Sequence, residues 1–166
     1  MVVAQRSVKS DEEVAEMEKA LAVTRRMYLA AMSSTRPGLR ESDVVAAVDG
    51  VAQAEGLLTA FPTILSINVH VFHNPYHDNK LPKGRLLVID AGASSSLGYA
   101  SDITRTIPVS GVYTQEQKEI YEIVLKGQLQ AIAMMKPGIK YKEVHLAVAR
   151  TMAAGLKALG LMKGDT

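Results

Sequence analysis

The stretch LLVIDAGASSSLGYASDITRTI, from Leu86 to Ile107, decides the fold of this chain. Its first run, Leu86–Asp90, is apolar up to a final carboxylate and is typical of a buried strand. Its second run, Tyr99–Ile107, alternates along the chain, so Asp102 and Thr104 are expected on one face of a strand. Glycines and serines fill the interval between the runs, which predicts an antiparallel hairpin with a bulged or longer loop.

Such a hairpin places Asp90 and Asp102 roughly opposite each other. Directly opposed cross-strand residues lie about 4.5–5.5 Å apart at Cβ. Two carboxylates at that distance repel each other, so either one takes up a proton or a cation lies between them. Hard divalent ions prefer oxygen ligands, and pairs of metal ions about 3.5–4 Å apart occur in hydrolytic enzymes. The alternative is that both acids lie on a solvated loop rim without a function, since Asp is common in turns.

The bulk composition restricts the class of protein. The 166 residues are 48% hydrophobic and 22% charged, which indicates one ordinary globular domain with a real core. A net charge of +2, with no basic run longer than Arg25-Arg26, gives no electrostatic support for nucleic-acid binding. No apolar stretch reaches the roughly 18 residues that a membrane span requires. The chain has no cysteine and its N-terminus has no signal-peptide pattern, so we expect a soluble cytoplasmic protein.

Capping signals and apolar periodicity predict four helices. A capping box at Ser10–Glu13 opens the first helix, which runs to about Ser34. The second is expected over about Glu41–Glu55, followed by Gly56 as a C-cap. A second capping box at Thr114–Gln117 opens a helix through about Met135, and the last helix runs over about Lys142–Leu159. The apolar stripe expected on the first helix comprises Val14, Met17, Leu21, Thr24, Met27, Tyr28 and Ala31; the second turns Val44, Val45, Val48 and Val51 inward. Ile64–Val71 is expected to form a strand and Phe72–Asn79 a loop.

The chain contains an internal repeat. The segment PGLRESDV at Pro37–Val44 returns as PGIKYKEV at Pro137–Val144, offset by 100 residues. Each copy follows one long amphipathic helix and precedes another, which favours a duplicated helix–helix–sheet unit. The first unit continues into strands, whereas the second ends after its helices. We therefore expect a truncated polypeptide, one completed by a partner, or one that self-associates through its exposed sheet.

These residues resemble the pita-bread metallopeptidases, specifically the branch of Xaa-Pro aminopeptidases and Xaa-Pro dipeptidases (prolidases). The resemblance runs from Arg6 onward and is most specific in Ile89–Ala93, Tyr99–Thr106 and Pro108–Gly111. It implies an α+β pita-bread fold with two pseudo-symmetric halves, in agreement with the repeat. The expected fold is incomplete, with a first repeat over about residues 10–110 and a partial second repeat over about 111–166. Residues 1–166 would then form a single catalytic domain truncated at its C-terminus.

The same resemblance implies roles for individual residues. Asp90 and Asp102 would be the first two ligands of a site for two divalent metal ions, with Asp102 bridging them. The metals are expected to be manganese or cobalt, or in some cases zinc. His73 falls on the family's substrate-side histidine, which hydrogen-bonds the peptide near the scissile bond. Thr104 is either a residue that orients the ligands or an ordinary β-branched strand residue.

Two other histidines match the family less securely, and part of its site is absent. His77 is expected to be exposed, and His70 to be a strand histidine or a pocket wall. The family completes its metal site with one His and two Glu from the second sheet, which lie beyond Thr166, and its usual N-terminal domain is absent too. We therefore expect weak or absent metal binding by the chain as given, and no activity of the chain alone.

The function expected from the resemblance is metal-dependent release of the N-terminal residue from peptides with proline second. The alternatives are an inactive pita-bread module that binds or scaffolds, and a relative in the methionine-aminopeptidase or creatinase branch. The presence of Asp90, Asp102 and His73 favours descent from an active enzyme, since a degenerate binder is expected to lose the carboxylates. No nucleic-acid or membrane partner is expected.

Overall fold

The structure is a computed structural model that describes residues 2–68, 70, 71 and 73–165. The chain forms two compact units, Met1–Val112 and Tyr113–Thr166. Within the described part, no helix is long and apolar enough to cross a membrane.

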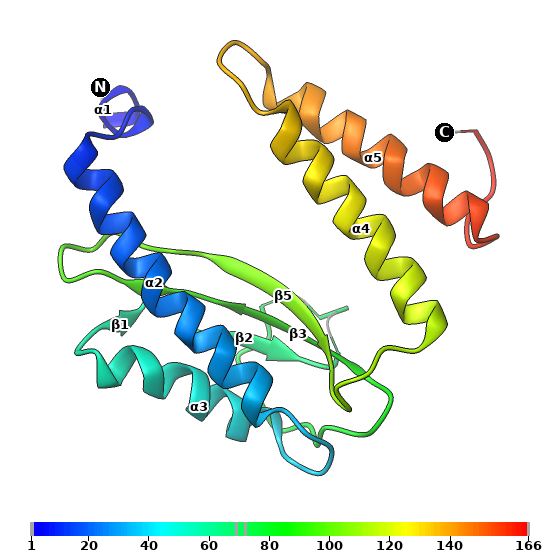
Figure 1. Cartoon of the computed structure of the whole chain (residues 1–166), viewed down its shortest axis with the longest axis horizontal. Helices are drawn as coiled ribbons and strands as arrows, with labels where there is room; N and C mark the ends of the chain where they lie inside the picture. Colours follow the sequence, from blue (N-terminus) through cyan, green and yellow to red (C-terminus); the bar gives the residue numbers. More distant parts are fainter. Residues whose placement is uncertain (1, 69, 72, 166) are drawn as a thin grey trace. The chain divides into compact units, whose positions relative to one another are not determined.

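The first unit begins with three helices: α1 (Val2–Ser7), α2 (Asp11–Ser34) and α3 (Glu41–Ala54). Helices α2 and α3 lie side by side (Figure 1). The predicted capping box at the start of α2 is confirmed, because the side chains of Ser10 and Glu13 each accept a hydrogen bond from the other's backbone N–H. The predicted bounds of α2 and α3 are correct to within a residue, whereas the short helix α1 was not predicted.

The apolar stripe of α2 differs from the prediction in its first half. Val14 and Leu21 are 43% and 41% exposed. The described residues that are buried begin only at Ala20, because the first half of the helix lies beyond the core. The buried set consists of Ala20, Val23, Thr24, Met27, Tyr28 and Ala31. On α3, Val44 and Val48 are buried, while Val45 and Val51 pack partly buried against the same core.

Two small antiparallel sheets follow in this unit. One has the order β2-β3-β5, formed by Ile64–Ser66, Leu86–Ala91 and Ile103–Pro108. The other pairs β1 (Leu58–Thr59) with β4 (Ala93–Ser94). The strand predicted over Ile64–Val71 is therefore shorter than expected, and its residue Val69 lies outside the described residues, as does Phe72 of the predicted loop.

The predicted hairpin exists, but its second strand begins at Ile103 rather than at Tyr99. Just before that strand, the backbone segments around Gly92 and Ser101 approach each other closely. A Cβ atom on Gly92 would lie 1.7 Å from the carbonyl oxygen of Ser101. The Ala93 N–H points at the hydroxyls of both Thr24 and Ser101, at 2.9 and 3.1 Å. This close crossing lies between the regular strand pair and the serine-rich loop, and the register is the same on both sides of it.

The core lies between the helices and one face of strand β3. Leu87, Ile89 and Ala91 are fully buried in the same cluster as Met27 and Val44. Successive side chains of a strand point to opposite faces, so Leu86, Val88 and Asp90 lie on the other face, where they are half-buried. The sheet therefore buries Leu87, Ile89 and Ala91 in the core and carries Asp90 on its other face.

A buried tyrosine fixes the two main strands to each other and to α2. The Tyr28 hydroxyl lies within hydrogen-bonding reach of the carbonyl oxygens of Ile89, at 2.9 Å, and Ile103. Burial raises the pKa of Tyr28 well above its usual value, so the phenol remains a donor at neutral pH. Ile89 precedes Asp90 and Ile103 follows Asp102. The Tyr28 hydroxyl therefore contacts both strands next to the residues that carry the two carboxylates.

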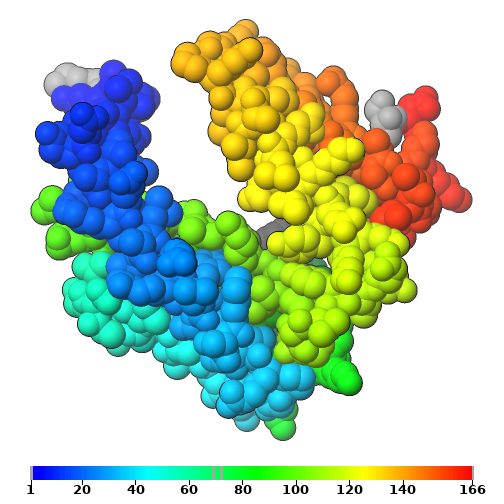
Figure 2. Space-filling model, viewed as in Figure 1, coloured from blue at the N-terminus to red at the C-terminus, as the bar shows by residue number. Residues whose placement is uncertain are grey.

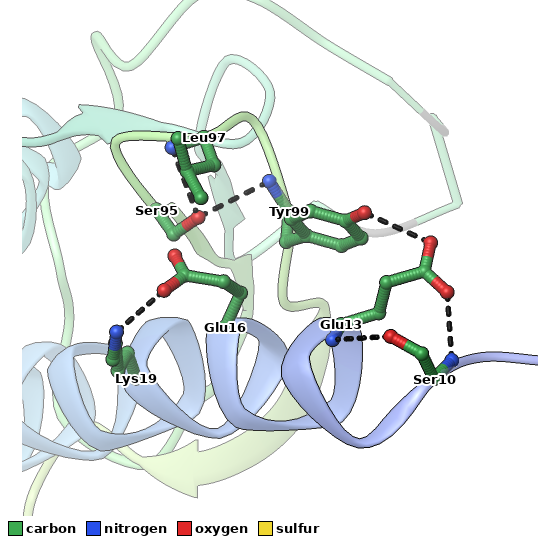
Figure 3. A network of polar contacts seen from close by, with 7 residues as sticks. All are labelled: Ser10, Glu13, Glu16, Lys19, Ser95, Leu97 and Tyr99. Carbon is green, nitrogen blue, oxygen red and sulfur yellow. Dashed lines mark hydrogen bonds and ion pairs between the residues drawn. The ribbon is translucent and has the colours of Figure 1, made fainter.

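The serine-rich loop is fastened to the start of α2 (Figure 3). The Tyr99 hydroxyl donates to Glu13 at 2.8 Å, and the Ser95 hydroxyl accepts from the backbone N–H groups of Leu97 and Tyr99. Glu13 also accepts from the Ser10 backbone at 2.8 Å, and these contacts hold the pKa of Glu13 below its usual range. The capping box therefore connects the loop to the helix as well as closing the helix end.

The second unit consists of α4 (Gln115–Met134) and α5 (Tyr141–Ala158), opened by the predicted capping box at Thr114. The two helices contact each other along their length; α4 is yellow and α5 orange in Figure 2. Gly155 allows a close contact, because a Cβ atom there would lie 2.8 Å from the Ile123 side chain. Many apolar side chains of this hairpin are exposed, among them Val124, Leu125, Leu129, Ile132, Met135 and Leu146.

Replacing Gly92 by alanine is expected to destabilise the first unit by about 1–3 kcal/mol, because the backbone of Ser101 must move to admit a methyl group. Urea unfolding followed by circular dichroism measures the effect. The matched control is Gly50→Ala inside α3, where a methyl group meets no atom within 4 Å. That control is expected to be neutral or to stabilise by up to about 1 kcal/mol. Equal stability of the two variants would contradict the close crossing.

The Glu13 contacts predict a pH-dependent contribution to stability. Since the folded-state pKa lies below the ordinary value of 4.5, the contribution is complete above that value and is lost as the pH falls through the folded-state pKa. The difference in unfolding free energy between the wild type and Glu13→Gln should therefore shrink from neutral pH toward acid. A difference that stays constant in urea titrations across this range would contradict the assignment.

Candidate metal and substrate site

The two predicted metal ligands lie on the same face of the sheet but are not directly opposed. The register pairs Asp90 of β3 with Thr104 of β5, and Ala91 with Ile103. Asp102 therefore lies just before β5, diagonal to Asp90. The two acids were expected roughly opposite each other, and they are diagonal neighbours because the hairpin turns about Leu97: the bridge between Ser94 and Ala100 continues the register of β3 and β5.

The diagonal arrangement still brings the two carboxylates into interaction. The pKa of Asp102 is raised by loss of solvent around its carboxyl, and then by the negative charge and a hydrogen bond of Asp90. These are the conditions under which one acid takes up a proton or a cation lies nearby. Thr104 is the residue of β5 that lies directly opposite Asp90, and its hydroxyl donates to Asp90 Oδ1 at 2.8 Å. Thr104 thus restricts the orientation of the Asp90 carboxylate.

Both acids line a pocket of about 650 Å³ within the first unit. The rest of its described wall comes from α3, from the segment that leads into β2, from β2 itself and from the loop that follows β2. These wall residues are Val45, Asp49, Phe61, Pro62, Thr63, Ile64, His73, Asn74, Pro75 and His77. A concave, largely apolar pocket with a few convergent polar groups is the usual form of a small-ligand site.

The three histidines considered from the sequence occupy different places. His73 lines the pocket and has a φ of 56°, in the left-handed region that few residues other than glycine adopt. His77 also lines the pocket and is partly buried, contrary to the expected exposure; its Nδ1 lies 3.2 Å from the carbonyl oxygen of Leu65. His70 is exposed and is not among the described residues of the pocket wall.

Sequence reasoning missed a second polar group of this pocket. The Thr63 hydroxyl donates to Asp49 Oδ1 at 2.6 Å, which joins α3 to the segment before β2. Asp49 follows Val48 on α3, and only a helical projection combined with the position of β2 could have placed it in the pocket. Phe61 and Pro62 also line the pocket, and no sequence pattern distinguished them from residues of an ordinary loop.

The chemistry of the donor set fits a divalent cation. Asp90 and Asp102 supply oxygen ligands from adjacent strands, and their mutual repulsion is relieved by a positive charge. No group of three or more such ligands occurs among the described residues. The described residues therefore offer two carboxylates that could hold a divalent ion, and the Thr104 hydroxyl donates to one of them.

Two helices that cover an antiparallel sheet, with paired carboxylates on the sheet facing a pocket, form an α+β arrangement that corresponds to part of a pita-bread fold. The chain belongs to metallopeptidase family M24, whose family model matches residues 15–164.

Similar proteins support the same branch of the family. The chain is 38% identical to the Xaa-Pro aminopeptidase of Haemophilus influenzae, over 96% of the chain and 38% of that protein. It is 36% identical to a glutamate-to-alanine variant of Escherichia coli aminopeptidase P in complex with substrate, with a TM-score of 0.93, over 97% of the chain and 37% of that protein. Pseudomonas aeruginosa aminopeptidase PepP gives 38% identity and a TM-score of 0.92, with the same coverage. The chain thus spans less than two-fifths of the length of these relatives, and the predicted resemblance to the Xaa-Pro aminopeptidase branch is confirmed.

Titration of the chain with Mn²⁺ is expected to show weak binding, with a Kd above about 10⁻⁴ M, since two carboxylates form an incomplete ligand set. Asp90→Asn should abolish this binding, whereas Asp78→Asn, at an exposed position outside the pocket wall, should leave it unchanged. Isothermal titration calorimetry measures both. Tight binding of two ions by the chain alone, or equal effects of the two variants, would contradict this assignment.

Proposed function

We propose that this chain is the metal-binding part of an aminopeptidase that removes the N-terminal residue from peptides with proline in the second position. The observation that carries the proposal is the convergence of Asp90, Asp102 and His73 on one pocket. Support comes from the relatives, which are Xaa-Pro aminopeptidases, and from the Escherichia coli aminopeptidase P structure in complex with substrate.

Each residue has a distinct task in this proposal. Asp90 and Asp102 would hold the divalent ions, and Thr104 keeps the Asp90 carboxylate in one orientation through its hydroxyl. Two bound divalent ions supply electrostatic activation of water and of the scissile carbonyl. His73 donates a hydrogen bond to the peptide near the scissile bond, from the pocket wall that it lines.

The metal we propose is manganese or cobalt. A zinc-substituted form of Escherichia coli aminopeptidase P in complex with product exists, which is consistent with zinc as a further occupant. The cytoplasmic location expected from the sequence stays a prediction, as does self-association through the exposed sheet.

The test is a peptidase assay on the polypeptide that carries this chain, with added Mn²⁺ and three substrates: Ala-Pro-Ala, Ala-Pro and Met-Ala-Ala. Cleavage of Ala-Pro-Ala is expected, and its ratio to Ala-Pro separates an aminopeptidase from a dipeptidase. Preference for Met-Ala-Ala would instead place the protein in the methionine-aminopeptidase branch. Peptide binding without cleavage of any substrate would favour the binding or scaffold module.

Two variants distinguish the ligand from its orienting residue in this assay. Asp102→Asn is expected to lower kcat/KM by more than about 100-fold, and Thr104→Val by about 10–100-fold, as is typical for partners of metal ligands. Thr104→Ser should retain activity because it keeps the hydroxyl. Full activity of Asp102→Asn would overturn the proposed function. The chain of 166 residues by itself is expected to show little or no turnover.

A further inference from the structure

Glu41, the first residue of α3, is an acid with 0% exposure. Its Oε1 accepts a hydrogen bond from the Ile67 backbone N–H at 2.8 Å, and its Oε2 accepts one from the Asn79 side-chain amide at 3.0 Å. Each carboxylate oxygen therefore has a neutral donor. Burial of a carboxylate is unfavourable unless such hydrogen bonds replace the lost water.

The two partners of Glu41 flank the loop that forms one wall of the pocket. Ile67 directly follows β2, and Asn79 directly precedes the bridge between Lys80 and Arg40. Four residues of the pocket wall lie between these two partners in the sequence: His73, Asn74, Pro75 and His77. The start of α3 adds two backbone contacts to the same loop: the N–H of Glu41 donates to the Asn79 carbonyl and that of Ser42 donates to the His77 carbonyl, each at 3.0 Å.

The internal repeat shows that a helix of this kind can begin without a glutamate at this position. At an offset of 100 residues the position of Glu41 corresponds to Tyr141, which starts α5 and is 81% exposed. The capping role in the first copy belongs to Asp43, whose carboxylate accepts from the Arg40 backbone N–H at 2.8 Å. The repeat also provides an acid, Glu143, at the position that corresponds to Asp43. The glutamate is thus specific to the copy that carries the pocket.

We propose that Glu41 is a positioning residue, which holds both ends of the pocket-wall loop and thereby sets the place of His73. The left-handed backbone of His73 agrees with this role, because such a conformation persists only where the surrounding contacts determine it. The relevance of Glu41 to peptide cleavage rests on the proposed function, whereas its control of the loop does not.

The test exchanges donor and acceptor between Glu41 and Asn79. Glu41→Gln places an NH₂ group against the Asn79 NH₂ group unless Asn79 rotates its amide by 180°, and in both cases the carboxylate that accepts from Ile67 and Asn79 is lost. The double variant Glu41→Gln/Asn79→Asp restores a donor–acceptor pair and keeps one negative charge at the site. Amide hydrogen exchange and the NMR signals of the His73 and His77 imidazoles report on the loop, and exchange in α2 and β3 reports on the core.

Glu41→Gln is expected to accelerate amide exchange at Ile67, which donates to Glu41, and at Ser42, which donates to the His77 carbonyl, by about tenfold. It should also shift the His73 imidazole signals and leave exchange in the core unchanged. The double variant should return both readouts to within about threefold of the wild type. The matched control, Tyr141→Gln at the equivalent position of the repeat, should change neither.

Equal acceleration in the loop and the core would show that Glu41 is only a structural core residue, and would overturn the proposal. So would an unchanged loop in Glu41→Gln, or a double variant that does not recover. If Glu41→Gln does not fold by itself, a folded double variant with wild-type exchange supports the proposal and an unfolded one contradicts it. Absence of Xaa-Pro cleavage by the wild type would overturn the proposed function and leave these exchange results as they are.

Discussion

The pairing of β3 with β5 is the interaction on which the site depends. Because side chains alternate along a strand, one register buries Ile89 under the helices and turns Asp90 toward the pocket. A slip by one residue would exchange these two faces. The register is fixed from two sides: Gly92 admits the backbone of Ser101, and the Tyr28 hydroxyl contacts a carbonyl of each strand. The position of the acids is thus a consequence of how the core packs.

The site combines electrostatic repulsion with a supporting framework of neutral hydrogen bonds. Asp90 and Asp102 raise the energy of the doubly ionised state, which a divalent cation relieves. The surrounding polar groups are matched instead: Thr104 donates to Asp90, Thr63 donates to Asp49, and Glu41 accepts from two donors. Among the described side chains, no buried polar atom lacks a partner. Within the pocket, the repulsion between like charges lies between Asp90 and Asp102.

The internal repeat illustrates how one structural unit can serve two purposes. Both copies form a pair of long helices joined through a Pro-Gly segment. In the first copy the pair covers a sheet, and Glu41 at the start of the second helix accepts hydrogen bonds from both ends of the pocket-wall loop. In the second copy the described helices α4 and α5 bury little beyond Gly127 and Val144 and leave an apolar surface exposed. The repeat therefore explains the shared helices, and the differences between the copies explain the pocket.

The sequence by itself determined the helices, the hairpin and the family, because capping boxes, periodicity and the segments around Asp90 and Asp102 are local signals. It could not determine the register of the hairpin, since no local signal says about which residue the serine-rich loop turns, and the pairing of Ser94 with Ala100 decides this. It also could not assign Glu41, whose partners lie 26 and 38 residues away. Only the tertiary structure decided these points, because burial and hydrogen bonding between distant segments exist only after the chain has packed.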